Sequence, residues 1–275
     1  MATVPAIKLN NGIEIPQLGL GVWQIPNGEV EGAMAAAFEA GYRHIDTAAA
    51  YNNEEGVGNA IVATALPREE LFITTKLRND DQGYDSTLRE FEASLKRLQV
   101  DYVDLYLIHW PQPARGLFPA TWKAFEEILA SGRARSIGVS NFREVDLDKL
   151  AETASIVPAV NQVELHLGFQ QAELRAYHAA HGIVTESWSP LGHGQSLENP
   201  AILALAAKYD KSAAQIILRW HIQIGAVVIP KSATAARIAE NIQIFDFELA
   251  ADDLATIAEL QTGTRIGPDP GTVGA

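Results

Sequence analysis

Three short apolar runs of the chain each end in an ionisable side chain, namely Asp46, Lys76 and His109. Tyr51 follows the first of them within the same segment. If the runs are neighbouring strands of a parallel barrel, their carboxyl ends meet at one mouth and the four side chains can converge there. Considered alone, Asp46 would be a strand-end carboxylate that bonds its own loop, and Tyr51 a half-buried aromatic residue. The recurrence of ionisable residues at three strand ends favours a shared site.

These four residue types suit proton transfer to a carbonyl oxygen. A tyrosine has an unperturbed pKa of about 10, which is too high for an efficient acid at neutral pH. An ammonium beside the phenol favours the phenolate and lowers that pKa, and a carboxylate would hold the ammonium charged and aimed. This assigns Tyr51 as the acid, Lys76 as its partner and Asp46 as the partner of Lys76. His109 could polarise the carbonyl oxygen, and the site would then need a hydride donor.

The positioning elements follow from the alternation of apolar runs with amphipathic segments. Strands are expected at 19–23, 43–46, 71–76, 103–109, 134–139, 159–163, 183–187 and 226–229. Helical spacing marks segments around 30–38, 54–64, 88–98, 122–129, 143–151, 170–181, 202–209, 213–224 and 235–244. Eight strand and helix alternations with short loops predict a closed (β/α)8 TIM barrel of the α/β class rather than an open sheet.

Both ends of the chain lie outside this alternation. Residues 7–16 carry an Asn-Gly turn between two alternating runs, which predicts a β-hairpin that closes the bottom of the barrel. The last residues, from Gly263, are rich in Gly and Pro and predict an irregular C-terminal tail. No linker or sequence repeat divides the chain, so residues 1–275 are expected to form a single domain.

Composition limits the possible functions. The formal net charge is −13, which opposes binding to nucleic acid and requires a local cationic pocket for any anionic ligand. No apolar run approaches the roughly 20 residues of a membrane-spanning helix. The chain contains no cysteine, and its amino terminus lacks the features of a signal peptide. We therefore expect a cytoplasmic protein with no membrane or nucleic-acid partner, and a monomer because no heptad pattern suggests assembly.

Six segments together resemble those of the aldo-keto reductases. The segments that resemble the catalytic ones are 41–51, 73–77 (Ile-Thr-Thr-Lys-Leu) and 105–111 (Leu-Tyr-Leu-Ile-His-Trp-Pro). Those that resemble the cofactor segments are 136–142 (Ser-Ile-Gly-Val-Ser-Asn-Phe), 160–164 (Val-Asn-Gln-Val-Glu) and 229–232 (Ile-Pro-Lys-Ser). The likeness spans essentially the whole chain in the right order. Within the family, with Trp188 in place of a common tyrosine, the chain resembles the bacterial 2,5-diketo-D-gluconate reductases.

The resemblance implies NADPH as cofactor and the reversible reduction of aldehydes or ketones, including dicarbonyl compounds and keto-sugars, to alcohols. Tyr51, Asp46, Lys76 and His109 would be catalytic, with Tyr51 donating the proton. Trp23, Tyr51, Arg78, His109 and Trp110 would line the substrate pocket. The implied cofactor contacts are Gly21, Val22, Trp23, Asp46, Ser140, Asn141, Gln162, Trp188, Ser189, Leu191, Gly192, His193, Gly194, Lys231, Ser232, Ala233, Thr234, Arg237, Glu240 and Asn241.

Two of these positions depart from the family pattern. Thr234 stands where close relatives often carry an arginine, which weakens the expected preference for NADPH because threonine offers no charge. Lys231, Ser232 and Arg237 would still suit the adenosine 2′-phosphate, although Arg237 alone could be a solvated helix residue. Arg78 stands where relatives usually have tryptophan. It could bind substrates that carry a carboxylate or many hydroxyls, or it could pair with Asp80 or Asp81 at the surface.

Other functions explain less of the sequence. Glu164 and Glu186, both near strand ends, could form a glycosidase pair, but that leaves Lys76 and the cationic residues after strand eight unexplained. His109, His166 and His193 do not have the spacing of a metal site, so no metal is expected. A non-enzymatic NADPH sensor, like the barrel subunits of some ion channels, remains an alternative. Trp188 could equally be a core tryptophan if the resemblance is set aside.

Overall fold

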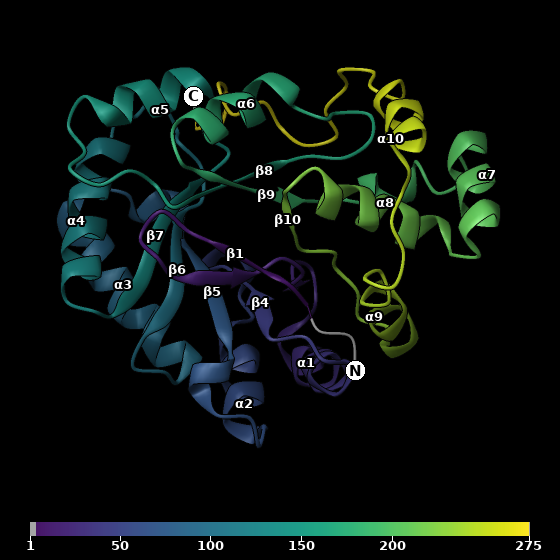
Figure 1. Ribbon diagram of the computed structural model, residues 1–275. Helices are drawn as coiled ribbons and strands as arrows, with labels where there is room; N and C mark the ends of the chain where they lie inside the picture. Colours follow the sequence, from purple (N-terminus) through teal and green to yellow (C-terminus); the bar gives the residue numbers. More distant parts are fainter. Residues whose placement is uncertain (1–3, 275) are drawn as a thin grey trace.

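The barrel is built from strands that follow one another in both sequence and space (Figure 1). The structure is a computed structural model that describes residues 4–274, so the first residues of the amino terminus considered above lie outside it. The barrel strands are β3 (Leu20–Gly21), β4 (His44–Asp46), β5 (Phe72–Leu77), β6 (Val103–Ile108), β7 (Ala134–Ser140), β8 (Val160–Glu164), β9 (Val184–Trp188) and β10 (Val227–Val228). All neighbouring pairs run parallel.

The two ends of this sheet meet, which closes the barrel. The backbone N–H of Gly19 donates to the carbonyl of Val228 at 2.9 Å, and that of Val228 donates to the carbonyl of Gln17 at 2.9 Å. Farther along, Gly21 bridges to Lys231 in parallel register. A closed parallel sheet covered by helices is buried on both faces, which explains why its strands read as short, nearly continuous apolar runs. The predicted (β/α)8 fold is confirmed.

The helices form the outer ring (Figure 1). They are α1 (Asn27–Ala40), α2 (Glu54–Ala63), α3 (Tyr84–Leu98), α4 (Phe118–Ala130), α5 (Glu144–Ala151), α6 (Ala172–Ala180), α7 (Pro200–Tyr209), α8 (Ala213–Gln223), α9 (Ala235–Asn241) and α10 (Ala251–Ala258). Their apolar faces join one core cluster with the outward side chains of the strands. Sequence-local capping fixes some starts, as in α8, where Ser212 and Gln215 bond each other reciprocally in a capping box.

The predicted hairpin is present and closes the bottom of the barrel. Strands β1 (Ala6–Lys8) and β2 (Glu14–Pro16) pair antiparallel. Leu9 and Ile15 are buried in a cluster with inward residues of the barrel strands. At the turn, the Asn11 side chain donates to the carbonyl of Arg135 at 2.9 Å, next to the start of β7. The hairpin thus seals the end of the barrel opposite to the strand carboxyl ends.

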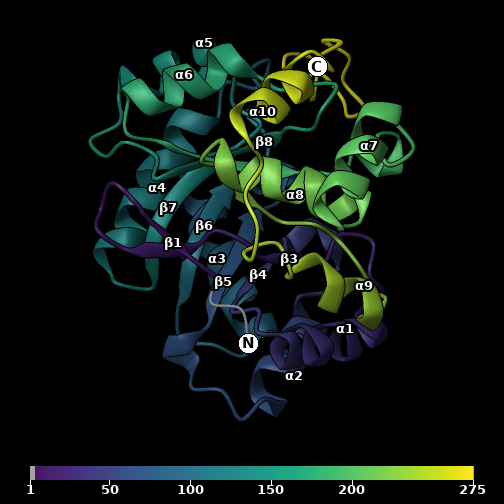
Figure 2. The ribbon, with the colours of Figure 1, turned by 45° about the vertical axis from the view of Figure 1, so that its right-hand side comes forward.

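Some element boundaries differ from the sequence expectation. The first and last barrel strands are shorter than predicted, and helix α10 was not predicted at all. This helix is short and lies beside α7 (Figure 2), where Asp253 accepts from Lys208 Nζ at 2.7 Å and Ile257 is buried. Residues 263–274 contain no helix or strand, as expected for the tail. No helix among the described residues is long and apolar enough to cross a membrane.

Candidate active site

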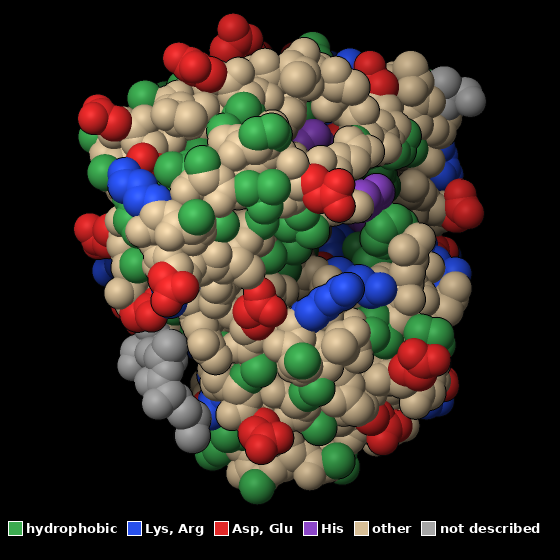
Figure 3. Space-filling model, turned by 90° about the vertical axis from the view of Figure 1, so that its right-hand side faces the viewer, with side chains coloured by type: hydrophobic (Ala, Val, Ile, Leu, Met, Phe, Trp, Pro, Cys, Tyr) green, Lys and Arg blue, Asp and Glu red, His purple; other side chains and the backbone are tan. Residues whose placement is uncertain are grey.

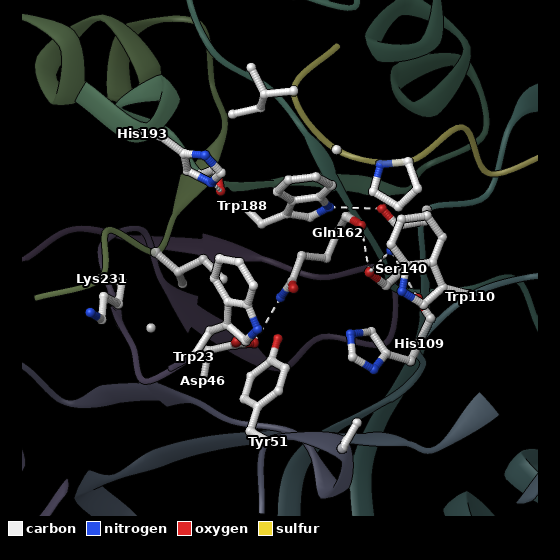
Figure 4. Close-up of a pocket in the computed structure, with 18 residues that line it drawn as sticks. Trp23, Asp46, Tyr51, His109, Trp110, Ser140, Gln162, Trp188, His193 and Lys231 are labelled. Atoms are coloured by element: carbon white, nitrogen blue, oxygen red, sulfur yellow. Dashed lines mark hydrogen bonds between the residues drawn. The ribbon is translucent and has the colours of Figure 1, made fainter. Parts of the chain in front are cut away.

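The four expected catalytic side chains converge at the carboxyl ends of β4, β5 and β6. The ammonium Nζ of Lys76 donates to Asp46 Oδ1 at 2.6 Å and to the Thr47 carbonyl at 2.9 Å. It also lies 3.4 Å from the Tyr51 hydroxyl. The Tyr51 and His109 rings meet edge to face, with their centroids 5.7 Å apart. Figure 4 shows Asp46, Tyr51 and His109 directed toward one pocket. Lys76 does not line this pocket.

Burial shapes the charges of this cluster. Burial disfavours the ammonium of Lys76, but Asp46 and Tyr51 outweigh it, so the pKa of Lys76 is raised. Burial also raises the pKa of Asp46, which the ammonium and an amide N–H of Gln162 oppose. Each ion thus offsets part of the cost of burying the other, because their attraction opposes the loss of solvation.

The pKa of Tyr51 differs from the sequence expectation. Burial raises the pKa of the phenol, and the nearby ammonium of Lys76 offsets only part of that rise. The sequence predicts a lowered pKa for Tyr51, and this prediction is wrong, because desolvation of the phenolate has a larger effect than the ammonium. Tyr51 is thus a protonated phenol with a cation beside it that can stabilise the phenolate once a proton has left.

His109 is a neutral imidazole. Burial, followed by the charge of Lys76, lowers the pKa of His109 to about 3. A neutral ring offers one N–H donor and one acceptor. Because the ring faces the pocket beside the Tyr51 hydroxyl, it can donate to a ligand oxygen without changing charge at physiological pH.

Next to the four expected catalytic side chains, called the tetrad from here on, lie three polar residues of β7 and β8 or directly after them: Ser140, Asn141 and Gln162. The side chain of Asn141 donates to the His109 carbonyl at 2.9 Å and to Ser140 Oγ at 3.1 Å. Gln162 Nε2 donates to Asp46 Oδ2 at 2.8 Å and to Glu186 Oε2 at 3.0 Å. With both amide hydrogens engaged, the oxygen of Gln162 is left to accept a bond from a ligand in the pocket.

Trp188 forms one wall of the pocket at the end of β9 (Figure 4). Its indole N–H donates to Asn141 Oδ1 at 2.8 Å, which fixes the plane of the ring. Gly267 of the tail packs so closely against this side chain that a Cβ there would lie 2.5 Å from the ring. Trp188 is therefore a partly buried side chain that lines the pocket together with the tail rather than a member of the core.

The tail is held in place by Glu164. This carboxylate, which ends β8, accepts from the backbone N–H of Ile266 at 2.6 Å and of Gly267 at 3.2 Å. It also contacts His166 at 3.1 Å and Arg265 at 3.5 Å. Burial would raise the pKa of Glu164, but the bonds from His166 and the two backbone N–H groups outweigh it and lower that pKa. Glu164 is thus an ionised anchor for the tail.

The pocket has a volume of about 440 Å³ and opens at the face shown in Figure 3, where basic and histidine side chains lie beside a hollow. Its lining residues are Gly21, Trp23, Asp46, Ala50, Tyr51, His109, Trp110, Ser140, Asn141, Gln162, Trp188, Ser189, His193, Ile229, Lys231, Ile266, Gly267 and Pro268. The sequence predicts an irregular tail from Gly263 on, without singling out Ile266, Gly267 or Pro268 as pocket residues. Nothing in a stretch without periodicity marks which residues reach a distant site.

Several expected cofactor residues lie around this pocket without lining it. Val22 and Gly192 are buried, Leu191 and Gly194 are partly buried in the loop after β9, and Ser232 and Asn241 are buried near α9. Ala233, Thr234, Arg237 and Glu240 are exposed beyond Lys231. The hydroxyl of Ser232 accepts from the backbone N–H of Thr234 at 3.1 Å and so shapes this turn. Of these residues, only Ala233, Thr234, Arg237 and Glu240, which follow Lys231 along the chain, are exposed to a ligand at the surface.

Arg78 does not line the pocket. Its guanidinium donates to the Ala49 carbonyl at 2.7 Å and to Asn52 Oδ1 at 2.5 Å. Asp80, one of its expected surface partners, lies 3.8 Å from Arg115 instead. Arg78 therefore ties down the turn that carries Tyr51.

Neither alternative chemistry finds support in the geometry. Glu164 and Glu186 are both fully buried and absent from the pocket wall, so they do not face a shared substrate position. His166 bonds Glu164, while His109 and His193 lie at separate parts of the pocket. Among the residues that the structure describes, no group of three or more His, Cys, Asp or Glu side chains could hold a metal ion.

Comparison with known proteins agrees with this geometry. A model of the Aldo/keto reductase family matches residues 17–262. The chain belongs to the aldo-keto reductase family. This aldo-keto reductase is 57% identical over 268 residues to a protein named aldo-keto reductase from Mycolicibacterium smegmatis, with 98% of each chain covered. It is 51% identical over 279 residues to methylglyoxal reductase DkgA from Escherichia coli, with 100% of each chain covered.

A solved relative shows the same architecture. A mutant of Gox0644 in complex with NADPH superposes on this aldo-keto reductase with a TM-score of 0.95 at 46% identity. The match covers 98% of this chain and 99% of that one. The fold therefore follows, over nearly its whole length, that of a protein solved with NADPH bound.

Proposed function

We propose that the protein reduces small aldehydes and ketones to alcohols with NADPH, and that Tyr51 donates the proton. The observation that supports this most strongly is the position of the Lys76 ammonium, 2.6 Å from Asp46 Oδ1 and 3.4 Å from the Tyr51 hydroxyl, at the base of a pocket edged by His109. A cation in this position stabilises the phenolate that forms when the phenol gives up its proton.

The residues present fit a nicotinamide dinucleotide. The free oxygen of Gln162 can accept from the nicotinamide carboxamide, and Ser140 and Asn141 lie within reach of the same group. The face of Trp188 suits stacking on the ring. At Gly21 a Cβ would lie 2.9 Å from the Ile229 carbonyl, so only glycine fits where the chain closes beside the pocket. NADPH, when bound, would supply the hydride.

The chain's own residues would supply the rest of the chemistry. The neutral imidazole of His109 donates to the carbonyl oxygen, which orients the substrate and polarises the C=O bond. As the carbonyl carbon gains the hydride and its electron pair, the oxygen gains a proton from the Tyr51 hydroxyl. The resulting phenolate is stabilised by the ammonium of Lys76 and regains its proton from solvent. Asp46 keeps that ammonium charged and aimed.

Preference for NADPH over NADH would come from cations outside the tetrad. Lys231 lines the pocket and lies opposite Gly21 where the barrel closes. Together with Ser232 and Arg237 it could bind the adenosine 2′-phosphate, with Ala233, Glu240 and Asn241 close to the adenosine. Thr234 adds no charge here, so we propose a smaller preference than an arginine at that position would give.

The substrate would be small and uncharged. The pocket lining includes the aromatic and apolar side chains of Trp23, Trp110, Ile266 and Pro268, and Lys231 is the only Lys or Arg among the lining residues described. Methylglyoxal, named for the Escherichia coli relative, is a compound of this kind. We therefore propose short aldehydes and α-dicarbonyl compounds as the preferred class.

We also propose, from the sequence expectations, that the chain acts as a single domain, as a monomer and in the cytoplasm. Light scattering of the purified protein measures its oligomeric state. Fractionation of the source cells measures its location.

The test of the proposed function is steady turnover of methylglyoxal with NADPH, followed by loss of the reduced cofactor's absorbance. Turnover that continues for many cycles supports an enzyme. Tight NADPH binding without turnover on any member of a panel of aldehydes and ketones would indicate the sensor alternative instead. Release of a chromogenic aglycone without cofactor would indicate glycoside hydrolysis.

A further inference from the structure

Glu186 is a buried carboxyl group that the proposed reaction does not use. It lies in β9 and is 0% exposed. Its Oε2 accepts from Gln162 Nε2 at 3.0 Å, and the same nitrogen donates to Asp46 Oδ2 at 2.8 Å. Two carboxyl groups are thus joined through one amide. The amide holds its oxygen toward the pocket only as long as both of its hydrogens are engaged.

The second oxygen of Glu186 faces a group that can accept a proton. Oε1 is buried without a hydrogen-bond partner among the described residues, and His44 Nε2 lies 3.7 Å from it. The other ring nitrogen of His44 faces the Pro16 carbonyl at 3.4 Å and must be the protonated one, because a carbonyl only accepts. Nε2 is therefore an acceptor, and the Thr74 hydroxyl, 3.2 Å away, can donate to it. A carboxylate of Glu186 would place a charged Oε1 against this unprotonated nitrogen with no donor to balance it, whereas a neutral Glu186 would not.

No cation is left to balance an ionised Glu186. Among the neighbours, β5 contributes Lys76, whose ammonium is bound to Asp46 of β4. Tyr51 and His44 are neutral, with the pKa of His44 lowered to about 3 by burial. Gln162 of β8 carries no charge, and Val227, the partner in β10, is apolar. Burial and then the charge of Asp46 raise the pKa of Glu186 to about 8.

We propose that Glu186 is a positioning residue of the reductase site that works as a neutral acid. It holds one N–H of Gln162 while Asp46 holds the other, which presents the Gln162 oxygen to the cofactor. Being neutral, it leaves the Lys76 and Asp46 pair balanced beneath Tyr51. This inference rests on the proposed function, because its role is defined by that reaction.

Loss of the Glu186 proton would work against the reaction. A second carboxylate next to Asp46 would raise the pKa of the Tyr51 phenol further and make it a weaker acid. It would also place a charged Oε1 3.7 Å from the unprotonated Nε2 of His44. Reduction should therefore become slower as Glu186 ionises in alkaline solution, with the fall beginning near the pKa of about 8.

The first experiment measures the proton directly, without cofactor or substrate. Infrared difference spectra of the full chain between neutral and alkaline pH should show the C=O band of a protonated carboxylic acid disappear as the pH rises. Glu186→Gln should lack that change. Glu164→Gln should retain it, because Glu164 is an ionised, buried glutamate at a neighbouring strand end. A wild-type spectrum without the band, or the same band in Glu186→Gln, would overturn the proposal.

The second experiment uses the pH profile of kcat/KM for methylglyoxal. The ratio of Glu186→Gln to wild type should rise about tenfold between about pH 7 and about pH 9.5, because the amide cannot ionise. Glu186→Met, which cannot accept from Gln162, should bind NADPH more weakly than Glu186→Gln. If the methionine variant does not fold, the pH dependence of the Glu186→Gln to wild-type ratio is sufficient to test the proposal. A ratio independent of pH would contradict the proposal. Absence of turnover by the wild type would instead refute the proposed function. The infrared experiment would still test the protonation of Glu186, because it needs neither cofactor nor substrate.

Discussion

Replacement of Lys76 by methionine should damage both the stability and the activity of the protein, for separate reasons. The ammonium is completely buried and makes its shortest bond, 2.6 Å, with Asp46, which is only 2% exposed. Methionine fills similar space but leaves the carboxylate of Asp46 buried without its cation. Breaking a buried ion pair on one side costs about 3–5 kcal/mol, so the free energy of unfolding should fall by that amount.

The effect on catalysis arises from Tyr51 rather than from folding. Without the ammonium at 3.4 Å nothing offsets the burial that already raises the pKa of the phenol. Loss of an effective general acid typically costs about 100-fold to 10,000-fold in rate, and we expect a loss in kcat/KM of this size.

A double variant separates the two effects. Asp46→Asn combined with Lys76→Met removes both charges, so most of the lost stability should return, since replacing both members of a buried pair is often nearly neutral. Activity should not return. Urea denaturation of wild type, both single variants and the double variant gives the free energies, and methylglyoxal turnover at saturating NADPH gives the rates. If Lys76→Met lost less than about 1 kcal/mol, or if the double variant recovered activity, the assignment of Lys76 would be refuted.

Three further predictions concern residues around the tetrad. Lys231→Ala should raise the Kd for NADPH about tenfold or more and leave that for NADH unchanged, since one charged bond is worth about 1.5–3 kcal/mol; fluorescence titration with both cofactors measures this. Arg78→Met should lower kcat/KM by the same factor for a charged keto acid and a neutral aldehyde, because Arg78 holds the turn on both sides of Tyr51. If only the charged substrate lost activity, Arg78 would instead contact the substrate. The free energy of unfolding of the wild type should fall, relative to that of Glu186→Gln, by about 1.4 kcal/mol per pH unit from about pH 4.5 to about pH 8. The reason is that the folded protein in this range binds one proton more than the unfolded chain, at Glu186. Urea denaturation measures this, and the same pH dependence of stability in both proteins would contradict it.

The convergence of the tetrad could be predicted from sequence because it depends on topology alone. The carboxyl ends of parallel strands in a barrel lie at the same mouth. Side chains near those ends, such as Asp46, Lys76 and His109, are therefore brought together regardless of the loop conformations. The hairpin was predictable for a similar reason, since its Asn-Gly turn is a local signal. The short strands at the closure were overestimated, because residues that continue an apolar run need not continue the hydrogen-bonded ladder.

Other features depend on contacts that no local pattern specifies. The direction of the Tyr51 pKa shift depends on how much water burial removes, and the sequence shows only that a lysine is near. The role of Glu164 in holding Ile266 joins segments far apart in the chain. The sequence does contain a signal for Glu186. It lies two residues before Trp188 in β9, so the alternation of side chains along a strand places both on the inward face. That pattern predicts a buried carboxyl but not its partner, Gln162.

The most direct test of the proposed mechanism is the rate of carbonyl reduction by Tyr51→Phe. This variant removes one hydroxyl from the pocket and leaves the Asp46 and Lys76 pair in place, so NADPH should bind with nearly the wild-type Kd. Turnover of methylglyoxal should fall by more than the roughly 100-fold to 10,000-fold typical of one general acid, because Lys76 also loses the phenolate that it stabilises. Turnover close to that of wild type, with cofactor binding intact, would contradict the assignment of Tyr51 as the proton donor.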